Sequence, residues 1–576
     1  MSEVVELALA LLVVVPVLGA TLPLALGLLR DQVGWAVAVA VLAVEAGLAA
    51  RVAYDLAIEG SRVVHVLGGE TFGRKSQELS SGESTEGFAV GIELVGDPLS
   101  GLVVALVAGV SLGVLAFARR SGPRGNAFYS GYLLLTGGLM GVALTGDLFN
   151  LFVFLEISGL TTYALVASGR SAPSAVAALK YLVLGTTGAS MYLIGVGYIF
   201  VRTGALNMVD VSETLAGNVE FLDTEGALYG DPLVVAAFGF IAVGLATKAA
   251  IFPLHTWQPD AYAEAPDTVT VYISALASTA AAYALARVTW FVFTPAFFDA
   301  GAANRRVLEF LLVLAATSVV VGSALAAMQP RVKRMFAYSS VAQFGLIVIG
   351  IGVAVHPAAG EQATRFAVYG VGIHLVGHAV IKSGLFATAG ALSAATGARR
   401  VGEYAGLARE RPFLAGGMAT LGFALVGVPP TVGFIGKWYV ALGAVEAEHW
   451  PLVTVIFVST VLSLLYMARV LEKLYFAGSP DATGEPAEEI AGSPGGAGGA
   501  VAADGGDTAE SITGESADSD EPVTTDGGGS ASLGMMALAL TAAVLTVVLG
   551  FAGSELSAVL DPVVEAVVDA APEVNP

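Results

Sequence analysis

Two charged side chains lie inside long apolar stretches of the chain, where charge is expensive. Glu156 has apolar and small residues around it for about eight positions on each side, and Lys248 lies between AVGLAT and AAIF. A charge placed inside a membrane costs roughly a few kcal/mol, so such a residue normally has a partner or a function. A lysine whose distance from Glu156 can change would be a switchable proton acceptor. We therefore expect both to handle protons, the alternative being static polar contacts between helices.

Three titratable residues follow at helical spacing in VGIHLVGHAVIKSGLF. His374, His378 and Lys382 stand at i, i+4 and i+8, which places them on one face of a helix. Such a stripe indicates a hydrated proton relay. The alternatives are satisfied core histidines or a metal site, and the second is disfavoured because no third ligand is near in sequence. We predict no bound metal and no cofactor.

Two further residues, Lys437 and His255, belong to the predicted proton relay, and Asp147 and Lys180 are secondary candidates. Lys437 could be the last proton carrier before release, and His255, just past Pro253, could link one half of the chain to the other. Asp147 stands where a helix begins, so it is either a site residue or a cap for the positive helix end. Lys180 is either functional or an anchor whose ammonium reaches the membrane surface.

The composition excludes a soluble fold. Hydrophobic residues make up 56% of the 576 residues, charged residues 13%, and the mean hydropathy is +0.77; soluble domains carry roughly 25% charge. The chain has no cysteine, which removes disulfides and cysteine-ligated iron–sulfur clusters. Redox chemistry would have to reside on a partner. No basic patch of the kind that binds nucleic acid is evident.

The apolar stretches predict an all-α integral membrane protein. A bilayer core of about 30 Å needs roughly 20 apolar residues per helix. Fourteen such spans occur, near residues 5–29, 33–57, 98–118, 128–145, 148–168, 177–201, 232–253, 268–292, 307–328, 336–355, 366–395, 413–444, 451–476 and 533–560.

The seventh and twelfth spans contain prolines and should be broken. Pro253 follows Lys248 in the seventh, whereas Pro429 and Pro430 precede Lys437 in the twelfth. Proline removes a backbone donor and clashes with the preceding turn. Broken helices in corresponding halves are typical of inverted repeats with a site near the membrane midplane. The order of break and lysine differs between the halves, which the sequence does not explain.

The predicted spans divide the chain into five regions. These are N-terminal helices 1–3 (1–118), a first repeat of helices 4–8 (119–292), a second repeat of helices 9–13 (293–476), an acidic loop (477–532), and helix 14 with its tail (533–576). The positions of Lys and Arg in the short loops predict that both termini lie outside. Residues 481–526 hold twelve acids and no Lys or Arg, which predicts a disordered cytoplasmic loop and suggests a halophile.

Five segments together resemble the proton-translocating antiporter-like family, which includes Mrp-type Na⁺/H⁺ antiporter subunits and membrane subunits of respiratory complex I. They are GDLFNLFVFLEISGLTTYALVASG (146–169), LATKAAIFPLHTWQPDAYAEAP (245–266), PRVKRMFAYSSVAQFG (330–345), the His/His/Lys helix, and GVPPTVGFIGK (427–437). The resemblance implies two inverted five-helix repeats joined by a hydrophilic axis. It also implies that Glu156, Lys248 and Lys437 match the family's charged residues of helices 5, 7 and 12. In helix 8, Thr279 stands where the family commonly has a lysine, which makes it a third secondary candidate.

The resemblance leads to three hypotheses of function. The segments GDLFNLFVFLE and AYSSVAQ are most similar to the Mrp D subunit. The leading hypothesis is therefore a proton-conducting subunit of a Na⁺/proton antiporter. It would have small hydrophobic partner subunits and lie in the cell membrane of a prokaryote, specifically a haloarchaeon. The second is a proton-pumping subunit of a complex I-like oxidoreductase or membrane hydrogenase. The third is a structural subunit that has lost its path at Thr279, because a hydroxyl cannot hold a charge near neutral pH.

Overall fold

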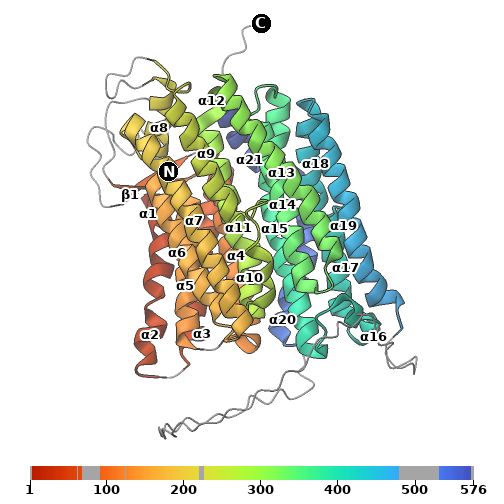
Figure 1. The fold of residues 1–576 in the computed structure, drawn as a ribbon. Coiled ribbons are helices and arrows are strands. Elements are labelled where there is room, and N and C mark those ends of the chain that lie inside the picture. The colour runs from red at the N-terminus through yellow and green to blue at the C-terminus, as the bar shows by residue number, and fades with distance from the viewer. Residues whose placement is uncertain are drawn as a thin grey trace, which may run out of the picture.

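The protein is an elongated bundle of long helices (Figure 1). The structure, a computed structural model, describes residues 3–30, 32–60, 62–67, 91–123, 125–218, 226–478 and 531–571. Within these ranges twelve segments are long and apolar enough to cross a membrane. The helices that form them are α1 (Glu3–Gly19) with α2 (Leu22–Gly27), α3 (Gly34–Glu59), α4 (Pro98–Ser121), α5 (Asn126–Leu144), α6 (Leu148–Ala167), α7 (Ala172–Thr203), α11 (Asp267–Arg287) continued by a π-helical turn and α12 (Thr294–Asp299), α13 (Ala302–Met328), α14 (Val332–Ala354), α15 (Glu361–Thr396), α19 (Trp450–Phe476) and α20 (Leu533–Phe551).

Two further segments are each split into two short helices. The first is α9 (Pro232–Lys248) followed by α10 (Gln258–Glu264), and the second is α17 (Pro412–Val426) followed by α18 (Val432–Glu446). With these two, the structure matches all fourteen predicted spans, including both predicted breaks. In Figure 1 the first broken segment descends from α9 to α10, whereas the second rises from α17 to α18, so the two run in opposite directions.

A few elements were not predicted from the sequence. An antiparallel hairpin pairs β1 (Val63–Leu67) with β2 (Ile92–Gly96). Both strands are only five residues long and lie far apart in the chain, so no local sequence pattern predicts their pairing. The described fold is completed by the short helices α8 (Met208–Ala216) and α16 (Leu407–Glu410), a 3₁₀ turn (Val401–Tyr404) and the C-terminal α21 (Gly553–Asp569).

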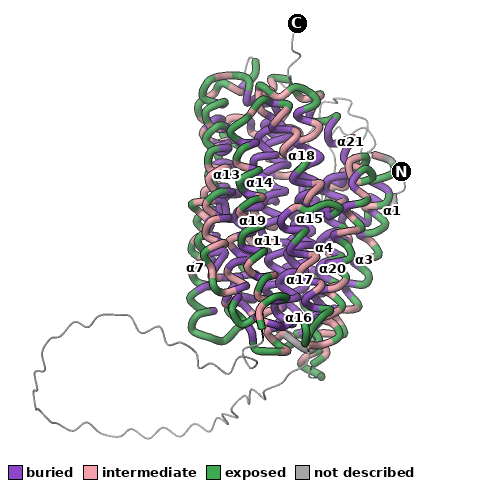
Figure 2. Tube along the Cα trace, turned by 90° about the vertical axis from the view of Figure 1, so that its right-hand side faces the viewer, coloured by how far each residue is buried: buried purple, intermediate pink, exposed green. Residues whose placement is uncertain are grey.

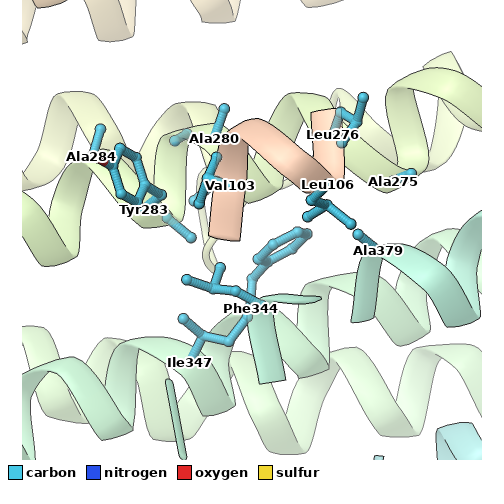
Figure 3. Packing of buried hydrophobic residues seen from close by; sticks show 14 of the residues in the cluster. Val103, Leu106, Ala275, Leu276, Ala280, Tyr283, Ala284, Phe344, Ile347 and Ala379 are labelled. Atoms are coloured by element: carbon cyan, nitrogen blue, oxygen red, sulfur yellow. The ribbon is translucent and has the colours of Figure 1, made fainter. Parts of the chain in front are cut away.

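The helices α11, α14 and α15 form the centre of the bundle. Nearly every residue of α11 and α14 and most of α15 are buried, and Figure 2 shows these helices in the purple interior, whereas α7 and α13 lie at its margin. In Figure 3, Phe344 of α14 points toward Leu106 of α4, in the buried cluster that also includes Leu276 and Ala280 of α11. Small residues let neighbouring helices approach closely. A Cβ on Gly322 of α13 would lie 2.7 Å from the Ala342 nitrogen of α14.

Some predictions about organisation stay untested. The chain leaves α19 and enters α20 at the lower end of Figure 1, opposite its C-terminus, but which end faces the cytoplasm stays a prediction. The boundaries at residues 118, 292, 476 and 532 also remain predictions. The acidic stretch 481–526 lies outside the described residues.

Candidate functional site: a line of buried charges

Lys248 and Glu156 form an ion pair in the first half of the bundle. The Lys248 ammonium donates a hydrogen bond of 2.8 Å to Glu156 Oε1 and lies 3.4 Å from the Leu155 carbonyl. The two side chains are 10% and 19% exposed. Their elements, α9 and α6, each pack against α7. The pair predicted from the sequence is therefore in contact.

The break in the seventh span begins at the lysine itself. Lys248 is the last residue of α9, and Ala250 two residues later has a positive φ of 58°. The carbonyls freed by the break have new donors: the Trp257 indole N–H bonds Thr247 O at 2.9 Å, and the Ser278 hydroxyl bonds Lys248 O at 3.3 Å. Such partners are what allow irregular backbone inside a bundle. The lysine is thus fixed at a helix end rather than along a regular helix.

A tyrosine that the sequence analysis did not select borders this pair. Tyr163, two turns after Glu156 on α6, lies against Gly159 and Gly185, where an added Cβ would meet its hydroxyl. The ring of Tyr163 packs edge-on against Tyr181, with centroids 4.6 Å apart. The two glycines leave room for a phenol hydroxyl close to the ion pair. A Gly159 Cβ would lie only 3.3 Å from Lys248 Nζ.

The histidine stripe lies on α15, in the second half, and is fully buried. His374 Nε2 is 3.0 Å from Gln343 Oε1 on α14, while its Nδ1 has no hydrogen-bond partner among the described groups. Neither ring nitrogen of His378 has such a partner, and its ring packs edge-on against Phe344. Buried polar atoms are ordinarily bonded to protein or to ordered water. These nitrogens could therefore bind water along the stripe.

Lys382, the third member, is anchored on α14. Its ammonium donates to Phe336 O at 2.9 Å and to Ser339 Oγ at 2.5 Å, and its exposed fraction is 0%. Gln343 and Ser339 were not selected as site residues, although both lie in the run AYSSVAQ. Their signal was polar residues at helical spacing in an otherwise apolar helix.

Lys437 lies at the second break. It is in α18, but its ammonium reaches back to the last carbonyls of α17 and donates to Leu425 O at 2.9 Å and Val426 O at 3.0 Å. A cation is stabilised at the negative end of a helix. Each half of the bundle therefore has a lysine ammonium at a helix break. Lys437 follows its break in the sequence, but its side chain reaches back to the end of α17. This accounts for the different order of break and lysine in the two halves.

Lys437 is also next to the histidine stripe. A Cβ on the neighbouring Gly436 would lie 2.9 Å from His374 Nδ1. That contact requires glycine because α18 and α15 approach closely at this point. The lysine therefore stands beside one end of the stripe, and Lys382 stands at the other.

His255 contacts the second half of the bundle, whereas the hydroxyl of Thr279 is bonded within its own helix. The His255 ring lies 6.0 Å from the ring of Tyr338 on α14, so it connects the first break with the second half. The Thr279 hydroxyl donates to Ala275 O of its own helix at 2.7 Å. The contact of α11 with the first break comes instead from Ser278, which donates to Lys248 O and also accepts from Gln258 Nε2 at 3.1 Å. Ser278 is a second polar residue that the sequence analysis missed.

The secondary candidates Asp147 and Lys180 have structural partners. Asp147 caps α6, accepting the Asn150 N–H at 2.7 Å. Burial raises the pKa of its carboxyl, although the N–H groups of Asn150 and Phe149 oppose this. Lys180 pairs with Asp260 of α10 at 2.7 Å, and Asp260 also contacts Arg334 at 2.9 Å. Lys180 is therefore part of an ion-pair cluster.

Comparison with known proteins agrees with this architecture. Residues 145–463 match the family model described as NADH:quinone oxidoreductase/Mrp antiporter, TM. The NADH-quinone oxidoreductase subunit N of Desulforudis audaxviator is 42% identical over 395 residues, which cover 68% of this chain and 74% of that protein. The subunit N of Halorhodospira halophila is 32% identical over 388 residues, 66% of this chain and 74% of that protein.

Solved structures with the same fold come from three kinds of complex. A chain of the archaeal membrane-bound sulfane sulfur reductase has a TM-score of 0.77 at 25% identity, covering 98% of both chains. A chain of the Mrp complex from Dietzia has a TM-score of 0.76 at 26% identity, covering 98% of this chain and 99% of that one. A chain of respiratory complex I from Thermus thermophilus shares the fold, with a TM-score of 0.64. The chain therefore belongs to the NADH:quinone oxidoreductase/Mrp antiporter transmembrane family, as a multi-pass, antiporter-like membrane subunit.

Proposed function

We propose that this chain is the proton-translocating membrane subunit of a redox-driven complex of the NADH-quinone oxidoreductase type, in the plasma membrane of a prokaryote. The observation that carries the proposal is the Lys248–Glu156 pair at the break of α9, followed by buried titratable groups that continue to a second lysine at the break of α18. The 42% identity to a subunit N supports the redox-driven assignment over the antiporter hypothesis that the motifs first suggested.

The proposed path begins at the ion pair. When Lys248 separates from Glu156, its ammonium loses its counter-charge and can release a proton. Polar groups at the break include Ser278 and Gln258, which are hydrogen-bonded to each other, and His255 lies on the same connecting segment. A hydroxyl and an amide can relay a proton only together with water, so this step depends on hydration rather than on a helix-8 lysine.

The path continues through the second half. His255 faces Tyr338, whose neighbour Ser339 accepts a hydrogen bond from Lys382. From Lys382 the stripe leads through His378 and His374 to Lys437, where the ammonium at the end of α17 is the release group. Histidine suits this role because one ring nitrogen can accept a proton while the other donates one.

The driving reaction would belong to partner subunits. With no cysteine, the chain has no thiolate ligand for an iron–sulfur cluster. We therefore expect hydrophobic partners in the membrane and a redox-active peripheral part. Moving one charge across 100 mV takes about 2.3 kcal/mol, which the redox reaction must supply for each proton pumped.

A subunit of a Na⁺/proton antiporter is the second candidate. Its support is the structural similarity over 98% of the chain to the Mrp complex of Dietzia, together with the motifs at residues 146–169 and 330–345. In that case the same proton path would run inward and drive cation export through a partner. The haloarchaeal origin remains a prediction from composition.

The test begins with the purified complex. The chain is tagged, extracted in mild detergent and analysed for co-purifying proteins; iron–sulfur or flavin subunits support the redox-driven complex, and their replacement by small hydrophobic subunits alone supports the antiporter. Inverted membrane vesicles carrying Lys248→Ala or Glu156→Gln are then assayed for proton uptake driven by an electron donor, and for uptake driven by a Na⁺ gradient.

The expected result is loss of donor-driven proton uptake in both variants with the complex still assembled. The matched control is Lys473→Ala, which removes a lysine that is 41% exposed near the end of α19 and contacts Glu472. Uptake that persists unchanged in Lys248→Ala and Glu156→Gln would refute proton translocation through this pair and favour the purely structural subunit.

A further inference from the structure

The short helix α10, which follows the first break, carries two acidic residues that the proton path does not use. Asp260 and Glu264 are four residues apart, so they lie on one face of the helix. Asp260 Oδ2 is 2.7 Å from Lys180 Nζ of α7, and Asp260 Oδ1 is 2.9 Å from Arg334 Nη1 of α14. Glu264 pairs with Arg331 of α14 at 2.7 Å. Charge therefore ties α10 to one helix of each half of the bundle.

The contacts between this segment and α14 form a ladder that leads to His255. Its three rungs, which follow the two elements in opposite directions, are Glu264–Arg331, Asp260–Arg334 and His255–Tyr338. Arg334 also lies over the ring of Tyr338, with its Cζ 5.9 Å from the ring centroid. The Asp260 carboxylate thus holds the arginine that contacts the tyrosine next to His255.

These ion pairs fix a position more than they add stability. The side chains of Asp260 and Arg334 are 26% and 33% exposed, and partly exposed pairs contribute little to stability one by one. The chain between α9 and α10, which carries His255, consists of turns. Its position therefore depends on what holds its two ends. A shift of α10 would have to break the contacts of Asp260 and Glu264 together.

We propose that Asp260 and Glu264 are positioning residues for the passage of protons between the two halves, because their ion pairs with α14 hold His255 beside Tyr338. The inference rests on the proposed proton path through His255. In the transfer one ring nitrogen of His255 accepts a proton and the other releases one. The two carboxylates keep their charge throughout and act only through the position of the histidine.

The first test measures donor-driven proton uptake by inverted vesicles that contain the assembled complex with Asp260→Asn. This variant keeps the size of the side chain but leaves Lys180 and Arg334 without their shared counter-charge. Maximal uptake should fall at least about tenfold and up to about a hundredfold, the cost of misplacing a reacting group by about 1 Å. The KM for the electron donor and the thermal midpoint of the complex should stay close to native. Asp260→Glu, which restores a carboxylate, should recover most of the uptake.

Two further variants separate the possible outcomes of this test. Asp299→Asn is the matched control, because it makes the same change at an exposed ion pair with Arg305 outside the ladder, and it should leave uptake unchanged. Uptake that is lost in Lys248→Ala but unchanged in Asp260→Asn would overturn this inference alone. Uptake that persists in Lys248→Ala would instead overturn the proposed function. A thermal midpoint that falls together with uptake, without recovery in Asp260→Glu, would show a merely structural role.

A reversible cross-link tests the ladder without relying on Asp260. The side chains of Glu264 and Arg331 are 22% and 42% exposed and line a cavity of about 470 Å³, and the chain has no cysteine of its own. In Glu264→Cys/Arg331→Cys, uptake should fall. A short bis-methanethiosulfonate linker between the two thiols should restore it, and a reductant should remove the gain.

The cross-link also decides the matter if Asp260→Asn fails to assemble. If α10 had to move away from α14 during turnover, the linker would block the remaining uptake instead of restoring it. Such a block would overturn the proposal, and so would uptake that stays at the native level in the double variant before the linker is added.

Discussion

Removing one member of the Lys248–Glu156 pair should destabilise the complex far more than removing both. At the observed separation of 2.8 Å, the attraction between two unit charges is about 6 kcal/mol at an effective dielectric constant of about 20. Most of this offsets the cost of desolvating the two charges. Glu156→Gln leaves the ammonium buried without its counter-charge, which costs about 3–5 kcal/mol.

The double variant Glu156→Gln/Lys248→Met should recover much of that loss. It contains no unpaired charge, and replacing a buried ion pair by residues of similar volume is often close to neutral. We therefore expect a coupling free energy of about 2–5 kcal/mol from a double-mutant cycle, against about 0–1 kcal/mol for an exposed pair. Asp299 and Arg305 supply that exposed comparison, with side chains 49% and 48% exposed.

The assay is thermal unfolding of the purified complex for the two single variants, the double variant and the native chain, repeated for the Asp299–Arg305 pair. Proton uptake should be lost in the single variants and in the double variant alike, because recovery of stability does not restore the proton carrier. A coupling free energy at Lys248–Glu156 no larger than that of the exposed pair would refute the reasoning. It would mean that the charges do not depend on each other.

Three further predictions concern residues around the path. Asp147→Ala should lower stability by about 1 kcal/mol, measured as a lower thermal midpoint, because it removes the cap of α6. Asp147→Asn should retain most of the stability because asparagine can also cap a helix, and an equal loss in both variants would argue against the cap. Gly185→Ala should cost about 1–3 kcal/mol and reduce proton uptake because its Cβ displaces Tyr163 beside the ion pair, whereas Gly197→Ala on the same helix, with open space around it, should leave uptake unchanged. Burial, together with His449 and Arg305, lowers the pKa of His356 to about 4. The unfolded chain therefore protonates this histidine at a higher pH than the folded chain does, and stability should fall as the pH decreases from about 6.5 toward 4. The decrease should be smaller in His356→Gln, and identical pH profiles of the two proteins would contradict this.

The helical bundle could be predicted from the sequence because its signals are local. A span needs only a run of apolar residues, and a break needs only proline near a buried lysine, so both the fourteen spans and the two breaks at Pro253 and Pro429–Pro430 were predicted. The alignment of His374, His378 and Lys382 was equally local, since helical spacing alone fixes a face. The β1–β2 hairpin was missed because its pairing joins residues far apart in the chain.

The sequence by itself determined which residues are too costly to bury without a reason: Glu156, Lys248, the histidine stripe and Lys437 all follow from charge within apolar surroundings. Only the tertiary structure decided their partners. It paired Lys248 with Glu156, brought the Lys437 ammonium to the end of α17, and gave the Lys248 carbonyl at the first break a hydrogen bond from Ser278 rather than from Thr279. The physical reason is that the cost of burying a charge depends on the residue itself, whereas its compensation depends on atoms that only helix packing brings within reach.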